Sequence, residues 1–182
     1  DCTGELLARW TQLGALTPFF RNHAAMGTAD QEPWAFGPEI EAICRRAIEL
    51  RYELLPAIYT ACWESGQSGA PIMRPLVLAY QSDPIAINLD DQFTLGSDLL
   101  VAPVLEEGAA GRSVYLPAGQ WYDFWRGQRL AGQREHWADA PLDLVPLFVK
   151  AGTVLPMQPV QQHTSQPPAE TVTLRVYPGI GE

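Results

Sequence analysis

Three consecutive polar residues, Arg21, Asn22 and His23, are the part of this sequence whose side chains are best suited to chemistry. A histidine ring can donate a hydrogen bond from one nitrogen and accept one at the other, and a guanidinium can pair with a carboxylate through two parallel bonds. The three residues follow an apolar run, Pro18-Phe19-Phe20. If that run is a strand, the polar side chains stand at its C-terminal end and can hydrogen-bond a ligand there.

Each of these side chains also has a structural alternative. Arg21 can form an ion pair that supports the end of the strand, Asn22 can bond to the loop that follows, and a lone histidine is more often structural than functional. The nearby carboxylates of Asp30 and Glu32 could be imagined as an acid–base pair with His23. General acid–base catalysis needs a held geometry and a tuned pKa, which a Gly/Pro-flanked loop offers poorly, so we expect Glu32 to anchor the loop.

A predicted helix lies on either side of this cluster. Apolar residues at spacings of three and four predict a helix over residues 5–16, which Pro18 ends because the residue before a proline avoids the helical region. A longer apolar pattern predicts a second helix over residues 38–64, with Pro56 kinking it. Arg51 interrupts the apolar side of this helix, so its charge needs a partner.

From residue 70 onward the composition is that of β-strands separated by turns. The predicted strands are residues 71–80, 98–104, 113–116, 144–149 and 171–176. Several short strands with turn residues between them indicate a β-sandwich. Residues 158–169 are rich in Gln and Pro and predict a linker or an exposed loop.

The helical and β parts do not alternate, which indicates an α+β chain of two domains. A helix, a short segment that ends in polar residues and a long helix are typical of one slice of a (β/α)8 barrel, in which the C-terminal ends of strands carry the chemistry. We therefore predict a terminal helix–strand–helix slice of a barrel over residues 1–66 and an antiparallel β-sandwich over residues 67–157. Residues 158–182 are predicted to be a linker and the start of a further β segment.

Composition excludes several classes of function. Twelve basic against 21 acidic residues give a net charge of -9, which disfavours nucleic acids and anionic membranes as partners. The sequence holds no Gly-rich phosphate loop and no Cys/His spacing typical of zinc, so no cofactor and no metal are expected. Cys44 and Cys62 lie too far apart on the predicted helix to form a disulfide. Unpaired thiols fit a reducing compartment such as the cytoplasm but leave the location of the protein open.

Several sequence motifs resemble those of glycoside hydrolase family 31, the α-glucosidase group, and they occur in the same order as in that family. The motifs at residues 9–15, 18–23 and 31–34 resemble the last barrel segment of that family, and residues 51–56 resemble its helix after the final barrel strand. The segments that resemble its proximal C-terminal β-sandwich are residues 71–76, 96–104 and 115–123. The matches run from about residue 5 to residue 157.

The resemblance implies a retaining hydrolase that releases terminal α-linked glucose from oligosaccharides, with two carboxylates about 5–5.5 Å apart as nucleophile and acid/base. In the family both are aspartates on earlier barrel strands, so no catalytic residue is expected in this chain, and the chain alone should be inactive. His23 would line the subsite for the non-reducing-end glucose, with Arg21 and Asn22 beside it. The implied partners are an α-glucoside oligosaccharide and the rest of the chain's own barrel. Residues 21–23 and 31–34 look more like the glucosidase than the α-xylosidase members.

Two rivals without hydrolytic activity remain, a carbohydrate-binding module and a purely structural β-sandwich. Aromatic faces stack on sugar rings, and the candidates for such contacts are Trp121, Tyr122, Phe124, Trp125 and Trp137. Aromatic residues in a sandwich usually belong to its core, which favours the scaffold over the module.

Overall fold

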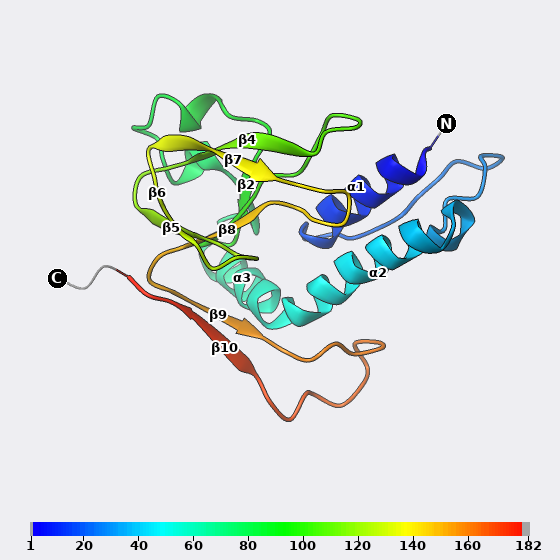
Figure 1. The fold of residues 1–182 in the computed structure, drawn as a ribbon. Coiled ribbons are helices and arrows are strands. Elements are labelled where there is room, and N and C mark those ends of the chain that lie inside the picture. Colours follow the sequence, from blue (N-terminus) through cyan, green and yellow to red (C-terminus); the bar gives the residue numbers. More distant parts are fainter. Residues whose placement is uncertain (1, 180–182) are drawn as a thin grey trace.

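A computed structural model describes residues 2–179 of the chain, which form three α-helices and ten strands (Figure 1). The helices are α1 (Gly4–Ala15), α2 (Pro38–Glu53) and α3 (Leu55–Ser68). The strands are β1 (Met73–Pro75), β2 (Phe93–Leu95), β3 (Leu99–Val101), β4 (Gly111–Leu116), β5 (Gln120–Asp123), β6 (Arg129–Ala131), β7 (Arg134–Asp139), β8 (Leu147–Lys150), β9 (Thr153–Met157) and β10 (Thr173–Tyr177). Short 3-10 turns occupy Pro33–Phe36, Leu76–Leu78 and Ala86–Asn88.

Helix α1 agrees with its predicted bounds. The hydroxyl of Thr3 accepts a hydrogen bond from the backbone N–H of Leu6 at 3.2 Å, which satisfies one of the free donors of the first turn. The helix ends at Ala15, three residues before Pro18. Its last turn is closed by the N–H of Leu16, which donates to the carbonyl of Leu13 at 3.0 Å.

The predicted kinked helix over residues 38–64 consists of two separate helices that meet at Leu54. Pro56 lies in the first turn of α3, where its missing N–H costs no hydrogen bond. The side chain of Leu54 is fully buried at the bend. Proline therefore acts here as a helix start rather than as a kink, and α3 continues to Ser68 before Gly69 ends it in a left-handed conformation with φ 75°.

The strands form three antiparallel sheets. Six strands make the main sheet in the order β1-β2-β3-β8-β5-β6, while β4 pairs with β7 and β9 pairs with β10. The pair β4–β7 lies over one face of the main sheet, and the helices and β9–β10 lie on its other side (Figure 1). The predicted fold, a barrel end followed by an antiparallel β-sandwich, is confirmed.

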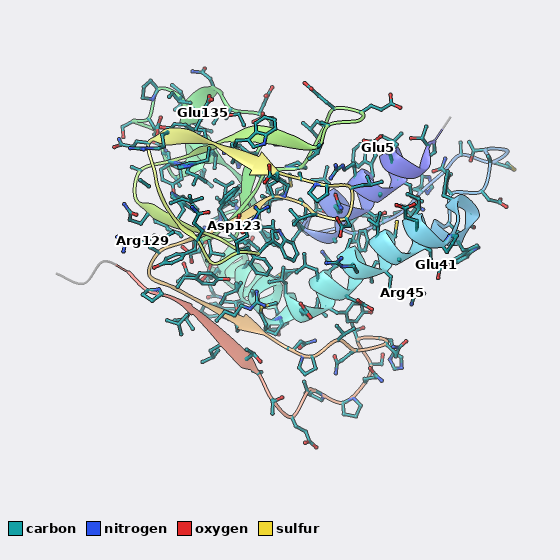
Figure 2. The ribbon with its side chains drawn as sticks, in the orientation of Figure 1. Glu5, Glu41, Arg45, Asp123, Arg129 and Glu135 are labelled. Carbon is teal, nitrogen blue, oxygen red and sulfur yellow. The ribbon has the colours of Figure 1, made fainter. Side chains whose placement is uncertain are left out.

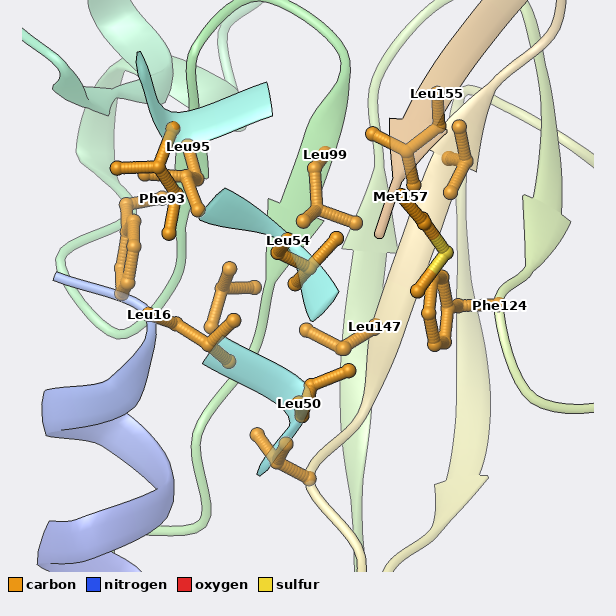
Figure 3. Close-up of a cluster of buried hydrophobic side chains, with 14 of the residues drawn as sticks. Leu16, Leu50, Leu54, Phe93, Leu95, Leu99, Phe124, Leu147, Leu155 and Met157 are labelled. Carbon is orange, nitrogen blue, oxygen red and sulfur yellow. The ribbon is translucent and has the colours of Figure 1, made fainter. Parts of the chain in front are cut away.

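The main sheet separates two apolar cores because successive strand residues point to opposite faces. In β3, Leu100 points toward β4–β7, whereas Leu99 and Val101 point toward the helices. In β8, Phe148 joins the first side and Leu147 the second. Figure 3 shows the helix-side cluster, in which Leu16 at the end of α1 meets side chains from α2, the main sheet and β9. The helices thus share a core with the sandwich.

Several strand predictions need correction. The predicted strand over residues 71–80 contains only β1 and then turns into a 3-10 segment, and the strand predicted over 144–149 begins at Leu147. Strands β2, β5, β6, β7 and β9 were not among those predicted. Residues 158–172 form a connection that lets β10 return to β9. The division of the chain at residues 66 and 157 stays a prediction.

Candidate sugar-binding site

The segment that carries Arg21, Asn22 and His23 follows α1 directly and has no regular secondary structure. We expected a strand here, and this expectation is wrong for the described residues 2–179. A strand needs a hydrogen-bonding neighbour, and within those residues none pairs with this segment. The segment is held by side chains instead.

Arg51 on α2 supplies most of that support. Its Nη1 donates hydrogen bonds to the carbonyls of Ala15 at 2.8 Å and Thr17 at 2.7 Å, and its Nη2 donates to the carbonyl of Pro18 at 3.2 Å. The predicted partner of the Arg51 charge is therefore a set of backbone carbonyls, which lie where the chain leaves α1.

Arg21 and His23 contact each other. The Nη2 of Arg21 donates to the Nδ1 of His23 at 2.6 Å. Because arginine has no acceptor, Nδ1 is the accepting nitrogen in this contact and the proton of a neutral ring sits on Nε2, which is left to donate elsewhere. In the described part of the chain Arg21 makes no ion pair, and a carboxylate partner for it in the rest of the barrel stays a prediction.

Asn22 closes the loop that follows. Its amide nitrogen donates to the carbonyl of Gln31 at 2.8 Å, which agrees with the structural alternative for this residue. Glu32 lies at the start of the 3-10 turn Pro33–Phe36, and its carbonyl accepts from the N–H of Ala35 at 2.9 Å. Asn22 therefore sets where the 22–31 loop returns toward the helices.

An open cavity of about 1270 Å³ lies between α1 and the segment from Phe19 to Phe36. Arg21, Asn22 and His23 all line it, together with Asp30. Three polar side chains with hydrogen-bonding capacity thus face one hollow, which is the arrangement that a hydroxyl-rich ligand needs.

The open side of this slice is unusually apolar. Trp10 is 62%, Phe19 74% and Trp34 68% exposed. Large exposed apolar surfaces on a soluble protein mark contact sites for other protein surface. No group of histidine, cysteine and acidic side chains in the described residues has the arrangement of a metal site, and no described helix is long and apolar enough to cross a membrane.

The aromatic residues of the sandwich are mostly core. Trp121 is fully buried and its ring N–H donates to the carbonyl of Pro117 at 2.9 Å. Trp125 donates to the carbonyl of Val145 at 2.7 Å and meets the ring of Phe124 edge-on. Trp137 is largely exposed, at 70%, and Trp125 is 37% exposed, but the ring N–H of Trp125 already bonds within the protein. One largely exposed ring gives little support to the carbohydrate-binding module.

Sequence reasoning missed the role of Arg9, which joins α1 to the sandwich. Its guanidinium is buried and donates to the carbonyls of Ala109, Ala140, Pro141 and Leu144 at 2.8–3.2 Å. Burial lowers the pKa of Arg9, and the nearby charges of Glu5 and Asp143 raise it. The signal was present in the spacing, since Arg9 and Gln12 share a helix face with small alanines.

Two further contacts run across the same junction. The Glu5 carboxylate accepts from the N–H of Gly108 at 2.8 Å, and the amide of Gln12 donates to the carbonyl of Leu142 at 2.7 Å. In contrast, Glu41 and Arg45 on α2 pair only with each other at 2.7 Å, on the side of the helix away from the sandwich (Figure 2). The polar contacts of α1 therefore fix the barrel slice against the sheet.

The helices that flank the polar cluster pack on an antiparallel β-sandwich, and comparison with known protein families matches both parts. The glycosyl hydrolases family 31 TIM-barrel domain matches residues 1–61, and the glycosyl hydrolase family 31 C-terminal domain matches residues 69–155. The chain belongs to glycoside hydrolase family 31.

Individual relatives lead to the same family. The chain is 43% identical over 181 residues to alpha-glucosidase 2 of Bacillus thermoamyloliquefaciens, covering all of this chain and 23% of the relative. It is 37% identical to an alpha-xylosidase of Saccharolobus solfataricus over 96% of the chain and 24% of that enzyme. The structure of a family 31 dextranase of Flavobacterium johnsoniae, complexed with glucose, superposes with a TM-score of 0.93 at 44% identity over 97% of the chain and 22% of the dextranase. The chain therefore spans less than a quarter of the length of these relatives.

Proposed function

We propose that this chain is part of a retaining α-glucosidase that hydrolyses terminal α-linked glucose from oligosaccharides. The catalytic aspartates would lie outside the chain, which would supply substrate-binding residues and a sandwich that supports the barrel. Membership of family 31 supports this proposal, as do the α-glucosidases among the relatives and the glucose bound to the dextranase.

The contact between Arg21 and His23 is the observation that best supports a sugar-binding role for particular residues of this chain. It fixes the orientation of the imidazole and leaves the Nε2–H of the neutral ring to donate to a sugar hydroxyl in the open cavity. Arg21 then acts through His23 as well as through its own remaining donors, and Asn22 acts by closing the loop beside them.

The rest of the chain's own barrel is the partner that best fits the exposed apolar side chains. Trp10 and Phe19 line the same cavity as the polar cluster, and Trp34 directly precedes Ala35 and Phe36, which also line it. Burying them against further barrel strands would remove apolar surface from water and would enclose the cavity, which favours both stability and sugar binding.

Kinetics of the full-length protein test the proposal. With an aryl α-glucoside as substrate, His23→Ala should lower kcat/KM by about tenfold or more, the effect of losing one buried hydrogen bond to the substrate. The matched control is His163→Ala, because His163 lies in the connection between β9 and β10. Comparison of aryl α-glucoside with aryl α-xyloside decides between the two specificities found among the relatives.

Two outcomes would contradict the proposal. The first is unchanged kinetics of His23→Ala. The second is release of nitrophenol from the aryl α-glucoside by the isolated 182-residue chain, since that chain should hold no catalytic carboxylate pair.

A further inference from the structure

We propose that Gly14, Phe20 and Arg51 form a clamp that positions the sugar-binding segment, with Arg51 as its central positioning residue. The inference rests on the proposed function, because it assumes that His23 contacts the sugar. It adds residues that do not themselves reach the ligand but determine where the ligand-binding side chains stand.

The first component is the fork of hydrogen bonds from Arg51. The carbonyls of Ala15, Thr17 and Pro18 follow one another where α1 has ended, so no later helical N–H is available to satisfy them. One guanidinium satisfies all three, at 2.7–3.2 Å. A planar group with five donors in a rigid fork can do this, whereas an apolar residue would leave these acceptors unsatisfied.

The second component is the ring of Phe20. The guanidinium carbon of Arg51 lies 5.6 Å from the centroid of this ring, within the range of a cation–π contact. The same ring approaches α1 so closely that a Cβ added to Gly14 would lie 2.9 Å from Cδ2 and 3.0 Å from Cε2 of Phe20. Phe20 is therefore held between α1 and α2, and only a glycine at position 14 admits it without movement.

Charge and burial support a specific role for Arg51. Burial lowers the pKa of Arg51, because removing the guanidinium from water disfavours its charged form. Within residues 2–179 no carboxylate pairs with it. The guanidinium is stabilised by the carbonyl dipoles of residues 15–18 and by the ring of Phe20. These groups all lie in the segment that connects α1 to the polar cluster.

Within the described residues few other contacts hold His23 in place. His23 is three residues beyond Phe20, which is roughly 10 Å of extended chain, and no regular hydrogen-bond ladder lies between them. Within the described residues, the contact of Asn22 with Gln31 is the other tether of this stretch to the loop. We therefore expect a shift of the Phe20 ring to move the imidazole of His23.

Substitutions in the full-length enzyme test this role. Arg51→Met should raise KM for an aryl α-glucoside about tenfold with a smaller change in kcat, because a displaced subsite weakens sugar binding. Arg51→Lys keeps the charge and part of the hydrogen bonding and should recover part of the loss. The matched control is Arg46→Met on the same helix, whose exposed ion pair with Asp143 lies away from the segment.

Gly14→Ala separates positioning from stability. Alanine favours the helix over glycine, so if the position of Phe20 does not matter for the site, we expect unchanged kinetics whatever the change in Tm. The clamp predicts instead a raised KM, since the new methyl group displaces Phe20. This variant also decides the question if Arg51→Met fails to fold.

The outcomes distinguish the two proposals. A raised KM in Arg51→Met and Gly14→Ala, with wild-type kinetics in Arg46→Met, supports the clamp. If His23→Ala raises KM but Gly14→Ala and Arg51→Lys do not, the clamp is wrong and the sugar-binding role of His23 stands. If His23→Ala leaves the kinetics unchanged, the proposed site fails and the clamp fails with it.

Discussion

At the scale of single residues, buried polar side chains hold parts of the chain that are distant in sequence. The guanidinium of Arg9 donates to four carbonyls about 100 residues or more along the chain. Arg9→Met would leave these acceptors without a donor, so we expect the free energy of unfolding to fall by about 2–4 kcal/mol. Urea denaturation of the chain measures this loss.

The control for Arg9 is Arg46→Met. Arg46 pairs with Asp143 at 3.0 Å, but both side chains are exposed, and such pairs contribute about 1 kcal/mol or less. Equal losses for the two variants would show that the buried fork is not what fastens α1 to the sandwich.

Tyr115 gives a pH dependence. Its hydroxyl donates to the Asp83 carboxylate at 2.8 Å, and burial together with this carboxylate raises the pKa of Tyr115 to about 12. The raised folded-state pKa means that the stabilisation is complete below the unfolded value of about 10 and is lost as the pH rises toward 12. We expect Tyr115→Phe to be about 1 kcal/mol less stable at pH 7 and to show a shallower decline between pH 10 and 12.

Unfolding measured from pH 8 to 12 in both proteins checks this expectation. Tyr80 and Tyr177, whose pKa values burial also raises, are unchanged and supply the common background. Parallel stability curves for the two proteins would contradict a role for the Tyr115 hydroxyl in the alkaline decline.

At the scale of elements, the junction of α2 and α3 depends on Leu54. This side chain is fully buried and packs within the helix-side core of the main sheet (Figure 3). Leu54→Ala should destabilise the chain by about 2–5 kcal/mol, since it loses apolar burial and leaves a cavity at the bend. Chemical denaturation measures the loss, with Leu105→Ala as the matched control because Leu105 is 64% exposed.

The elements also differ in how far the sequence could predict them. Helix α1 and the helices at 38–68 extend over enough residues for a period of 3.6 to be visible. The missed strands β2 and β6 have three residues each, and β2 is buried along its whole length, so no alternation marks it. The segment after Pro18 has strand composition but, within the described residues, no neighbour to pair with.

The site was predictable in its residue types and less so in its contacts. A charge in an apolar helix face indicated that Arg51 needs a partner, but the backbone carbonyls that it bonds have no sequence signature. The contact of Arg21 with His23 likewise has no sequence signature. Sequence shows which side chains carry hydrogen-bonding groups, and only the fold shows which groups lie opposite them.

At the scale of the whole molecule, the main sheet is covered on both faces. The β4–β7 pair covers one face, and the three helices with β9–β10 cover the other (Figure 1). On the helix side, Leu99, Val101, Leu147 and Val149 pack in one cluster with Leu50, Leu54 and Ile58, so without the helices this face would keep only part of its cover. The barrel slice is therefore part of the core of the sandwich and more than an attachment to it.

This shared core predicts that residues 69–182 do not form a stable domain alone. A fragment of these residues would expose the helix-facing core of the sheet, and an exposed apolar sheet surface favours aggregation. We expect it to bind a hydrophobic dye and to lack the cooperative unfolding of residues 1–182, measured side by side at equal concentration. Adding the helical fragment 1–68 should reduce dye binding by covering that face again. A monomeric 69–182 fragment with a cooperative transition would contradict the prediction and favour an independent sandwich, which is what a free-standing carbohydrate-binding module requires.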